Sequence, residues 1–217
     1  MIRLLSITIL LITPSLVFGD ASPFGRYSLG FGYSHDWDEF DLFDGHAVSI
    51  GGRVPIASKV DLGISSAYGS SEDNRDSPLI HEEYTNFGLI LNLGLHHKFN
   101  FEDSLVDCIA VSGGTGLSLF QQTYELSGSL VNDQKRSQTL TTYRLGLGLG
   151  VSLAERFWLS SGLTFSDYIN KDYNEALYAG ISLTSFITDS FFIDLGYSIR
   201  LNYVTTESIG IGAGYRW

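Results

Sequence analysis

Apolar and polar residues alternate with a period of two along most of this chain. The clearest run covers residues 143–153, where Leu145, Leu147 and Leu149 are separated by single glycines. Successive side chains of a β-strand point to opposite faces, so this pattern predicts strands with one apolar face. Ten such segments are expected, at about residues 27–34, 48–54, 60–68, 87–96, 105–120, 143–153, 157–166, 177–184, 193–201 and 208–217.

The second face of these segments indicates what kind of sheet they form. It consists mainly of Gly, Ser and Ala, whereas a strand facing water would carry Lys, Glu and Asp. Small residues pack well inside a narrow barrel, and the apolar face then contacts lipid. We therefore predict an all-β fold, a closed antiparallel transmembrane up-and-down β-barrel of ten strands. Eight strands is the alternative, because Asp107 interrupts the fifth segment.

Short turns and longer loops alternate between the segments, which is the asymmetry of bacterial barrels with short periplasmic turns. Aromatic residues also divide between the two ends, and this predicts a belt at each membrane interface. The belt near the short turns would contain Phe99, Phe101, Phe157, Trp158, Phe186, Phe191 and Trp217. The belt near the loops would contain Tyr33, Tyr68, Tyr84, Tyr124, Tyr143, Tyr168, Tyr173, Tyr178, Tyr197 and Tyr203.

The first residues have the composition of a secretory signal peptide. Arg3 precedes an apolar run over residues 4–18, and small residues follow it. We expect a signal peptide at residues 1–19 and an outer-membrane β-barrel domain at residues 20–217. Cleavage after Ala21 is the alternative.

The charge balance and the cysteine content exclude several classes of site. Acidic residues outnumber basic ones 24 to 13, which argues against a nucleic-acid partner, because phosphate binding needs clustered Lys and Arg. Cys108 is the only cysteine, so neither an intrachain disulfide nor a thiolate metal cluster can form. No cofactor is expected.

The last segment ends on aromatic residues, Tyr215 and Trp217, and this ending resembles the C-terminal assembly signal of Gram-negative outer-membrane barrels. By this ending, the signal peptide and the strand pattern, the chain resembles the small outer-membrane barrels of the opacity and surface-antigen type. The resemblance implies a place in the cell outer membrane, contact with its lipid and lipopolysaccharide, and insertion by the barrel assembly machinery. We expect a monomer.

The alternation places six charged residues on the inner face of the barrel. Four lie near the short-turn ends of their strands and are predicted to form a salt-bridged charge cluster in the lumen, because buried charges need partners: Arg53, Asp61, Asp194 and Arg216. Two line the upper lumen, where they would either select anions or bond loop carboxylates and strand-end carbonyls: Arg144 and Arg200.

The first outer loop carries five carboxylates among aromatic residues, and these are weak candidates for a Ca²⁺ or Mg²⁺ site: Asp36, Asp38, Glu39, Asp41 and Asp44. Their spacing does not fit an EF-hand loop, and a solvated acidic loop is the alternative.

Two histidines in the outer loops, His35 and His81, stand beside acidic residues and raise the question of catalysis. Ser34, His35 and Asp36 are adjacent, but neighbours in an extended segment point apart, so we assign no catalytic residue.

The sequence therefore predicts a non-enzymatic outer-membrane barrel that presents acidic loops outward, with a surface or membrane-integrity role. A narrow channel for small solutes or ions is one alternative, and a lipid-modifying hydrolase at the outer rim is another.

Overall fold

The computed structural model describes residues 26–38, 43–73, 81–101, 106–128, 133–153, 156–170, 175–202 and 205–217. The expected signal peptide lies outside them. No helix in these ranges is long and apolar enough to cross a membrane. They form ten strands: β1 (Ser28–Asp38), β2 (Phe43–Ala57), β3 (Val60–Asp73), β4 (His81–Asn100), β5 (Val106–Ser127), β6 (Gln134–Leu153), β7 (Phe157–Tyr168), β8 (Ala176–Phe186), β9 (Phe191–Arg200) and β10 (Thr206–Arg216).

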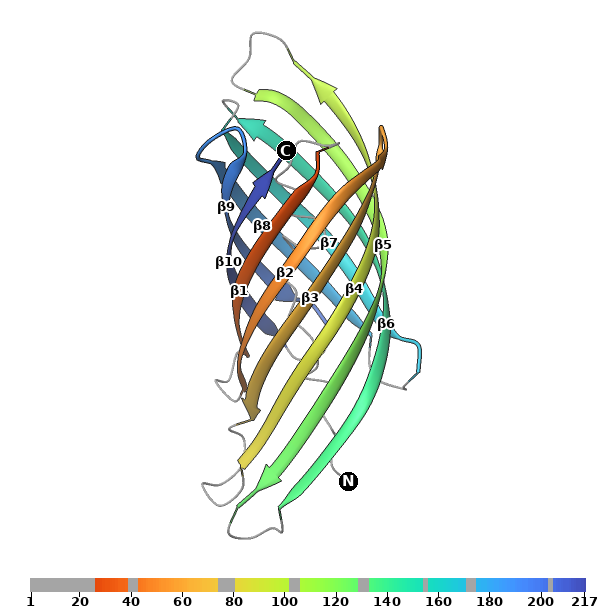
Figure 1. The fold of residues 1–217 in the computed structure, drawn as a ribbon, viewed down its shortest axis with the longest axis vertical. Helices are drawn as coiled ribbons and strands as arrows, with labels where there is room; N and C mark the ends of the chain where they lie inside the picture. Colours follow the sequence, from red (N-terminus) through yellow and green to blue (C-terminus); the bar gives the residue numbers. More distant parts are fainter. Residues whose placement is uncertain are drawn as a thin grey trace.

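Each strand pairs in antiparallel fashion with its neighbours in the chain, and β1 pairs with β10 to close the barrel (Figure 1). The closing register runs from Ser28 opposite Arg216 to Asp38 opposite Thr206. The prediction of a ten-stranded closed barrel is confirmed, and the eight-stranded alternative is wrong. The fifth segment is a full strand, with a register shift between Val106 and Cys108 where the pattern weakens.

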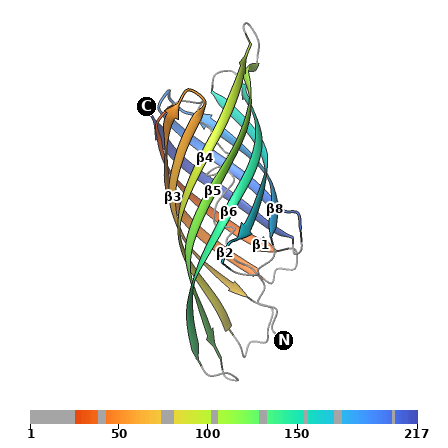
Figure 2. The same cartoon turned by 90° about the vertical axis from the view of Figure 1, so that its right-hand side faces the viewer.

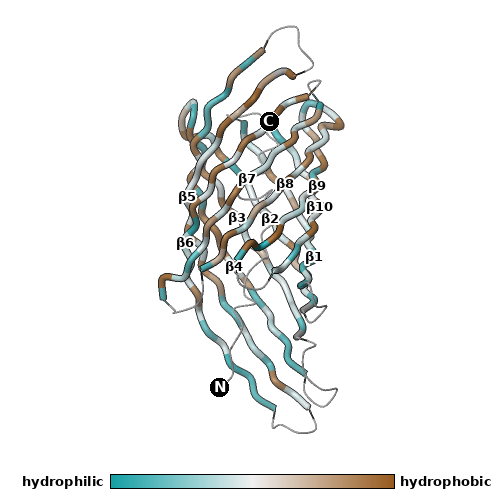
Figure 3. The backbone as a smooth tube through the Cα atoms, turned by 180° about the vertical axis from the view of Figure 1, so that it is seen from behind, coloured by the Kyte–Doolittle hydropathy of each residue, from teal (hydrophilic) through white to brown (hydrophobic). Residues whose placement is uncertain are grey.

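The apolar face of every strand points away from the barrel axis. Leu147 has 69% of its surface exposed, and Leu149 and Ile211 are also exposed. Figure 3 shows brown, hydrophobic positions interspersed with paler ones along the strands in the body of the barrel, and many teal, hydrophilic positions where strands project at its lower end. On β2 the outward positions from Val48 to Ile56 span nine residues, about the ~9–11 that cross a bilayer.

Three strands are longer than the rest. β4, β5 and β6 have 20, 22 and 20 residues, and their hairpins project at both ends of the barrel (Figure 2). We call the end with both barrel termini and the 57–60 turn the short-turn end, and the opposite end the loop end. The projecting residues at the loop end, 81–86, 121–127 and 134–141, are mostly polar on both faces, which makes them unsuited to lipid.

The predicted aromatic belts are only partly correct. Trp158 and Phe186 are buried in the lumen at the short-turn end, and Tyr84 is buried at the other end. Tyr124, Tyr168 and Tyr178 also occupy lumen-facing positions of their strands. The belts were predicted from distance to the turns, whereas the parity of a residue within its strand decides its side. Tyr173 and Tyr203 lie outside the described residues.

Lumen-facing glycines make room for aromatic rings on neighbouring strands. The Phe120 ring lies against Gly88, directly opposite it in the β4–β5 register, and a Cβ on Gly88 would overlap that ring. The same holds for Phe192 over Gly214 and for Trp158 over Gly150. Glycine at these positions therefore allows large side chains to fill a narrow lumen.

We expect Gly88→Ala to lower the free energy of unfolding by about 1–3 kcal/mol, because the new methyl group forces the Phe120 ring out of its position. Urea unfolding of the barrel in detergent measures this effect. Gly94→Ala is the matched control on the same face of β4, since its Cβ would meet only the Asp61 carbonyl oxygen at 3.9 Å. Equal stability of the two variants would contradict the packing argument.

Candidate functional sites in the lumen and at the outer rim

Arg53 and Asp61 lie together in the lumen at the short-turn end. The two residues are on neighbouring strands and interact electrostatically. A third residue, His96, completes this group: its Nδ1 is 3.2 Å from Asp61 Oδ2, and both side chains are only 6% exposed. Alternation places His96 on the inner face of its segment, but its contact with Asp61 was not predicted, because that contact depends on the β3–β4 register.

The other two predicted members of the charge cluster make separate contacts. Thr184 Oγ1 donates a hydrogen bond of 2.6 Å to buried Asp194 Oδ1. Arg216 Nε donates to the carbonyl oxygen of Asp189 at 2.7 Å, and its guanidinium lies 3.7 Å from the centroid of the Phe186 ring. All four residues thus lie at the short-turn end of the lumen. The contacts described above join each of them to a neighbouring strand or to the turn beside it.

A cluster of apolar side chains also lies in the lumen near the short-turn end. Trp158, Phe186, Cys108 and Ala110 form a buried cluster, and Phe192 packs against it. Phe186 and Phe192 meet edge to face, with ring centroids 6.1 Å apart. Cys108 is therefore a small packing residue of the lumen.

Both arginines predicted for the upper lumen lie inside the barrel toward its loop end. The Arg144 guanidinium lies 6.0 Å from the centroid of the Phe120 ring, and Arg200 Nη2 donates to the carbonyl oxygen of Glu175 at 3.3 Å. Three apolar side chains at this level, Ile90, Phe120 and Leu140, have 0% of their surface exposed. No space large enough for water therefore touches them.

We expect Asp61→Asn to reduce the free energy of unfolding by about 3–5 kcal/mol, because removal of one charge leaves its buried partners uncompensated. Equilibrium unfolding in detergent tests this expectation. Asp167→Asn is the control: Asp167 is only half-buried on the outer face, where it accepts a 3.3 Å hydrogen bond from Tyr143. It should cost less than about 1 kcal/mol, and a similar loss in both variants would refute the role of Asp61.

The three described carboxylates of the candidate cation site lie on opposite sides of the barrel wall. Asp36 and Asp38 point into the lumen and are buried, whereas Asp44 is on the outer face. Glu39 and Asp41 lie outside the described residues. The side chains of Ser34 and Asp36 are buried in the lumen while His35 points outward, so these three adjacent residues form no triad. His81, the first residue of β4, is exposed.

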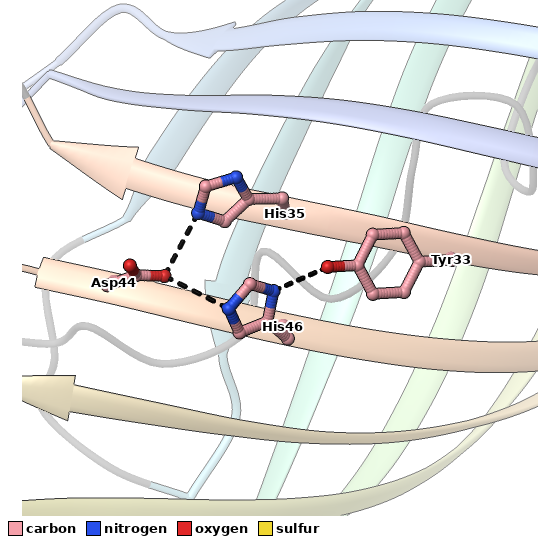
Figure 4. A network of polar contacts seen from close by, with 4 residues as sticks. All are labelled: Tyr33, His35, Asp44 and His46. Carbon is pink, nitrogen blue, oxygen red and sulfur yellow. Dashed lines mark hydrogen bonds and ion pairs between the residues drawn. The ribbon is translucent and has the colours of Figure 1, made fainter.

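Four side chains of β1 and β2 meet on the outer face near the loop end (Figure 4). Asp44 Oδ1 is 2.9 Å from His35 Nε2 and 3.3 Å from His46 Nε2. The two imidazole rings are stacked, with centroids 4.6 Å apart and planes 14° from parallel. The hydroxyl of Tyr33 is 2.6 Å from the other nitrogen of His46, Nδ1. We call His35, Asp44 and His46 the rim triad.

The antiparallel hairpin brings the rim triad together. His35 lies directly opposite His46, and Asp44 lies two pairs further along, opposite Trp37 and on the same outer face. Side chains opposite one another in such a pair have Cβ atoms about 4.5–5.5 Å apart. His46 and the pairing of Asp44 with His35 were missed because sequence adjacency was weighed in place of hairpin register. The equal spacing of His35 and His46 from the loop was the available signal.

Comparison with known proteins supports the fold. No model of a known protein family matches the chain, and no curated protein matches it. The translocator domain of the autotransporter NalP from Neisseria meningitidis superposes with a TM-score of 0.53 at 14% identity, over 91% of this chain and 90% of that one. The β domain of the Bordetella autotransporter BrkA gives a TM-score of 0.51 at 9% identity, over 89% and 98%.

The ten-stranded closure, the apolar exterior and these two matches define the class of the protein. It is a small transmembrane β-barrel, and its fold is the one that Gram-negative outer-membrane barrels share. Barrels of this type have short turns on the periplasmic side, which predicts a position in the outer leaflet for the rim triad.

Proposed function

We propose that this protein is a closed, non-enzymatic outer-membrane barrel that presents polar strand extensions and acidic loops at the cell surface. The observation that carries the proposal is the packing of the lumen. Ile90, Phe120 and Leu140 face the lumen near the loop end and expose none of their surface to water, and Trp158, Phe186, Cys108 and Ala110 form a buried cluster near the short-turn end. A conducting pore needs a continuous polar path through the lumen, and packed apolar side chains at two levels argue against such a path.

Reconstitution in planar bilayers tests the closed lumen. We expect the protein to give no steady single-channel steps, because ions cannot pass either packed level. The double variant Phe120→Ala/Trp158→Ala should conduct, since it removes a large ring from each level. Phe157→Ala, at an exposed phenylalanine beside Trp158, is the control and should stay silent. Steady conductance of the unaltered protein would defeat the proposal and favour a narrow channel.

The projecting parts of β4, β5 and β6 support the surface role. Their cross-strand contacts are polar: Lys135 Nζ pairs with Glu125 Oε1, and Gln138 donates to Gln122 at 2.8 Å. The Tyr84 and Tyr124 rings lie 5.1 Å apart on the inner side. A sheet that remains ordered and polar beyond the apolar band is suited to contact with water, lipopolysaccharide or an extracellular partner.

Labelling with a membrane-impermeant maleimide on intact cells tests which end faces outward. Ser137→Cys, exposed on the projecting part of β6, should react, and native Cys108 should not, because it is buried in the lumen. Ser58→Cys, in the turn between β2 and β3, is the matched control and should react only after the outer membrane is permeabilised. The reverse result would mean the opposite orientation.

Assembly is a separate part of the proposal. Tyr215 and Trp217 are exposed beside β1, and Trp217 stacks on Tyr27 with ring centroids 6.1 Å apart. Their accessibility on the outer face supports a role as the assembly signal read by the barrel assembly machinery. We also propose that the protein acts as a monomer.

A further inference from the structure

We propose that the rim triad, His35, Asp44 and His46, is a binding site for a divalent transition-metal ion, with Zn²⁺ as the ion that fits best. This site is independent of the closed lumen, because all three side chains lie on the outer face of the barrel.

The donor set selects the class of ion. Two imidazole nitrogens and one carboxylate oxygen are the ligands that Zn²⁺ takes in proteins, and they also suit Ni²⁺ and Cu²⁺. Ca²⁺ and Mg²⁺ require mainly oxygen ligands, so the nitrogen donors argue against them. One potential ligand atom from each of the three residues lies within 4.8 Å of the other two.

The spacing of the donors suits tetrahedral coordination. With metal–ligand bonds of 2.0–2.1 Å, two ligand atoms of a tetrahedral site are about 3.3 Å apart. Asp44 Oδ1 is 2.9 Å from His35 Nε2 and 3.3 Å from His46 Nε2, close to this spacing. The two imidazole rings, stacked 14° from parallel, must turn out of their stack so that both Nε2 lone pairs point at the ion. Three protein ligands leave the fourth position for water.

Tyr33 supplies the support that metal-binding histidines usually have. A histidine that binds through Nε2 carries its proton on Nδ1, and a hydrogen bond from that nitrogen fixes the ring. His46 Nδ1 is 2.6 Å from the Tyr33 hydroxyl, which places Nε2 on the side of Asp44. The paired backbones of β1 and β2 hold the other two residues in register.

The position of the triad in the membrane allows ions to reach it. Tyr33 and Val48 face one another on the outer face and are the last apolar pair of β1 and β2 on the loop side before the triad, while exposed Ile209 of β10 lies opposite His35. The triad therefore lies where the apolar band ends on the loop side, and this position points to the headgroup level. Its side chains are 36%, 54% and 51% exposed for His35, Asp44 and His46.

Calorimetric titration of the full chain, free of any affinity tag and folded in detergent, with ZnCl₂ alone tests the proposal. We expect one Zn²⁺ per barrel. His35→Gln and His46→Gln should each weaken binding by at least about 100-fold, and Tyr33→Phe by about 10–100-fold because it removes only the support of His46. Co²⁺ in place of Zn²⁺ should give the intense visible bands of a four-coordinate ion, and these should be lost in both histidine variants.

His97→Gln is the matched control, because His97 is also an exposed histidine of a strand, packed edge-on against Phe99 at the other end of the barrel. It should bind Zn²⁺ as the unaltered protein does. Each variant must show the gel-mobility shift of a folded barrel, so that loss of binding is not loss of fold. Absence of saturable binding, or binding that survives in His35→Gln/His46→Gln, would overturn the proposal.

Discussion

The structure depends on one constraint: in hydrocarbon, every backbone N–H and C=O must find its hydrogen-bond partner within the protein. An open sheet would leave two unpaired edges in lipid, so β1 must pair with β10 over the whole of its length, as it does from Ser28 to Asp38. The pairing of neighbouring strands fixes their register. Because two directly opposed residues face the same side of the sheet, register decides which pairs face the lipid and which face the lumen. The sequence alternates because apolar residues occupy the lipid-facing positions of each strand and small or polar residues occupy the lumen-facing positions.

Closure also makes the lumen narrow, and the small residues of the inner face follow from this. Where the lumen is filled, large rings use the space that glycine leaves on a neighbouring strand, as Phe120 does over Gly88 and Phe192 over Gly214. Buried charge in the lumen is paired at the short-turn end, where Asp61 lies against His96. Packing and charge pairing therefore support the same outcome, a barrel stabilised through its interior and surrounded by lipid.

The sequence was sufficient to predict the architecture because a membrane barrel imposes a strict pattern wherever a strand crosses hydrocarbon. It was insufficient beyond the membrane. Residues 121–127 and 134–138 read as a loop, yet they continue β5 and β6, because strands in water need no apolar face. The contacts in the lumen could be predicted only in part. Parity within the strands placed Arg53 and Asp61 inside, but the contact between Asp61 and His96 depends on the register between β3 and β4. Parity would also have placed Trp158 inside, had it been applied in preference to distance from the turn.

The rim triad illustrates why chemistry concentrates where the strands leave the bilayer. Below Tyr33 and Val48, an outward position must be apolar, and a histidine there would lose its hydration without gaining a partner. Two residues further toward the loop end on each strand, His35 and His46 meet a surface that water and ions can reach, while the sheet still holds them directly opposite one another. The boundary thus combines two properties that are otherwise separate, namely the rigidity of a paired sheet and the freedom to carry polar side chains. Precise donor spacing follows from the first property and access for an ion from the second, so the outer rim is the part of this barrel best suited to bind a metal.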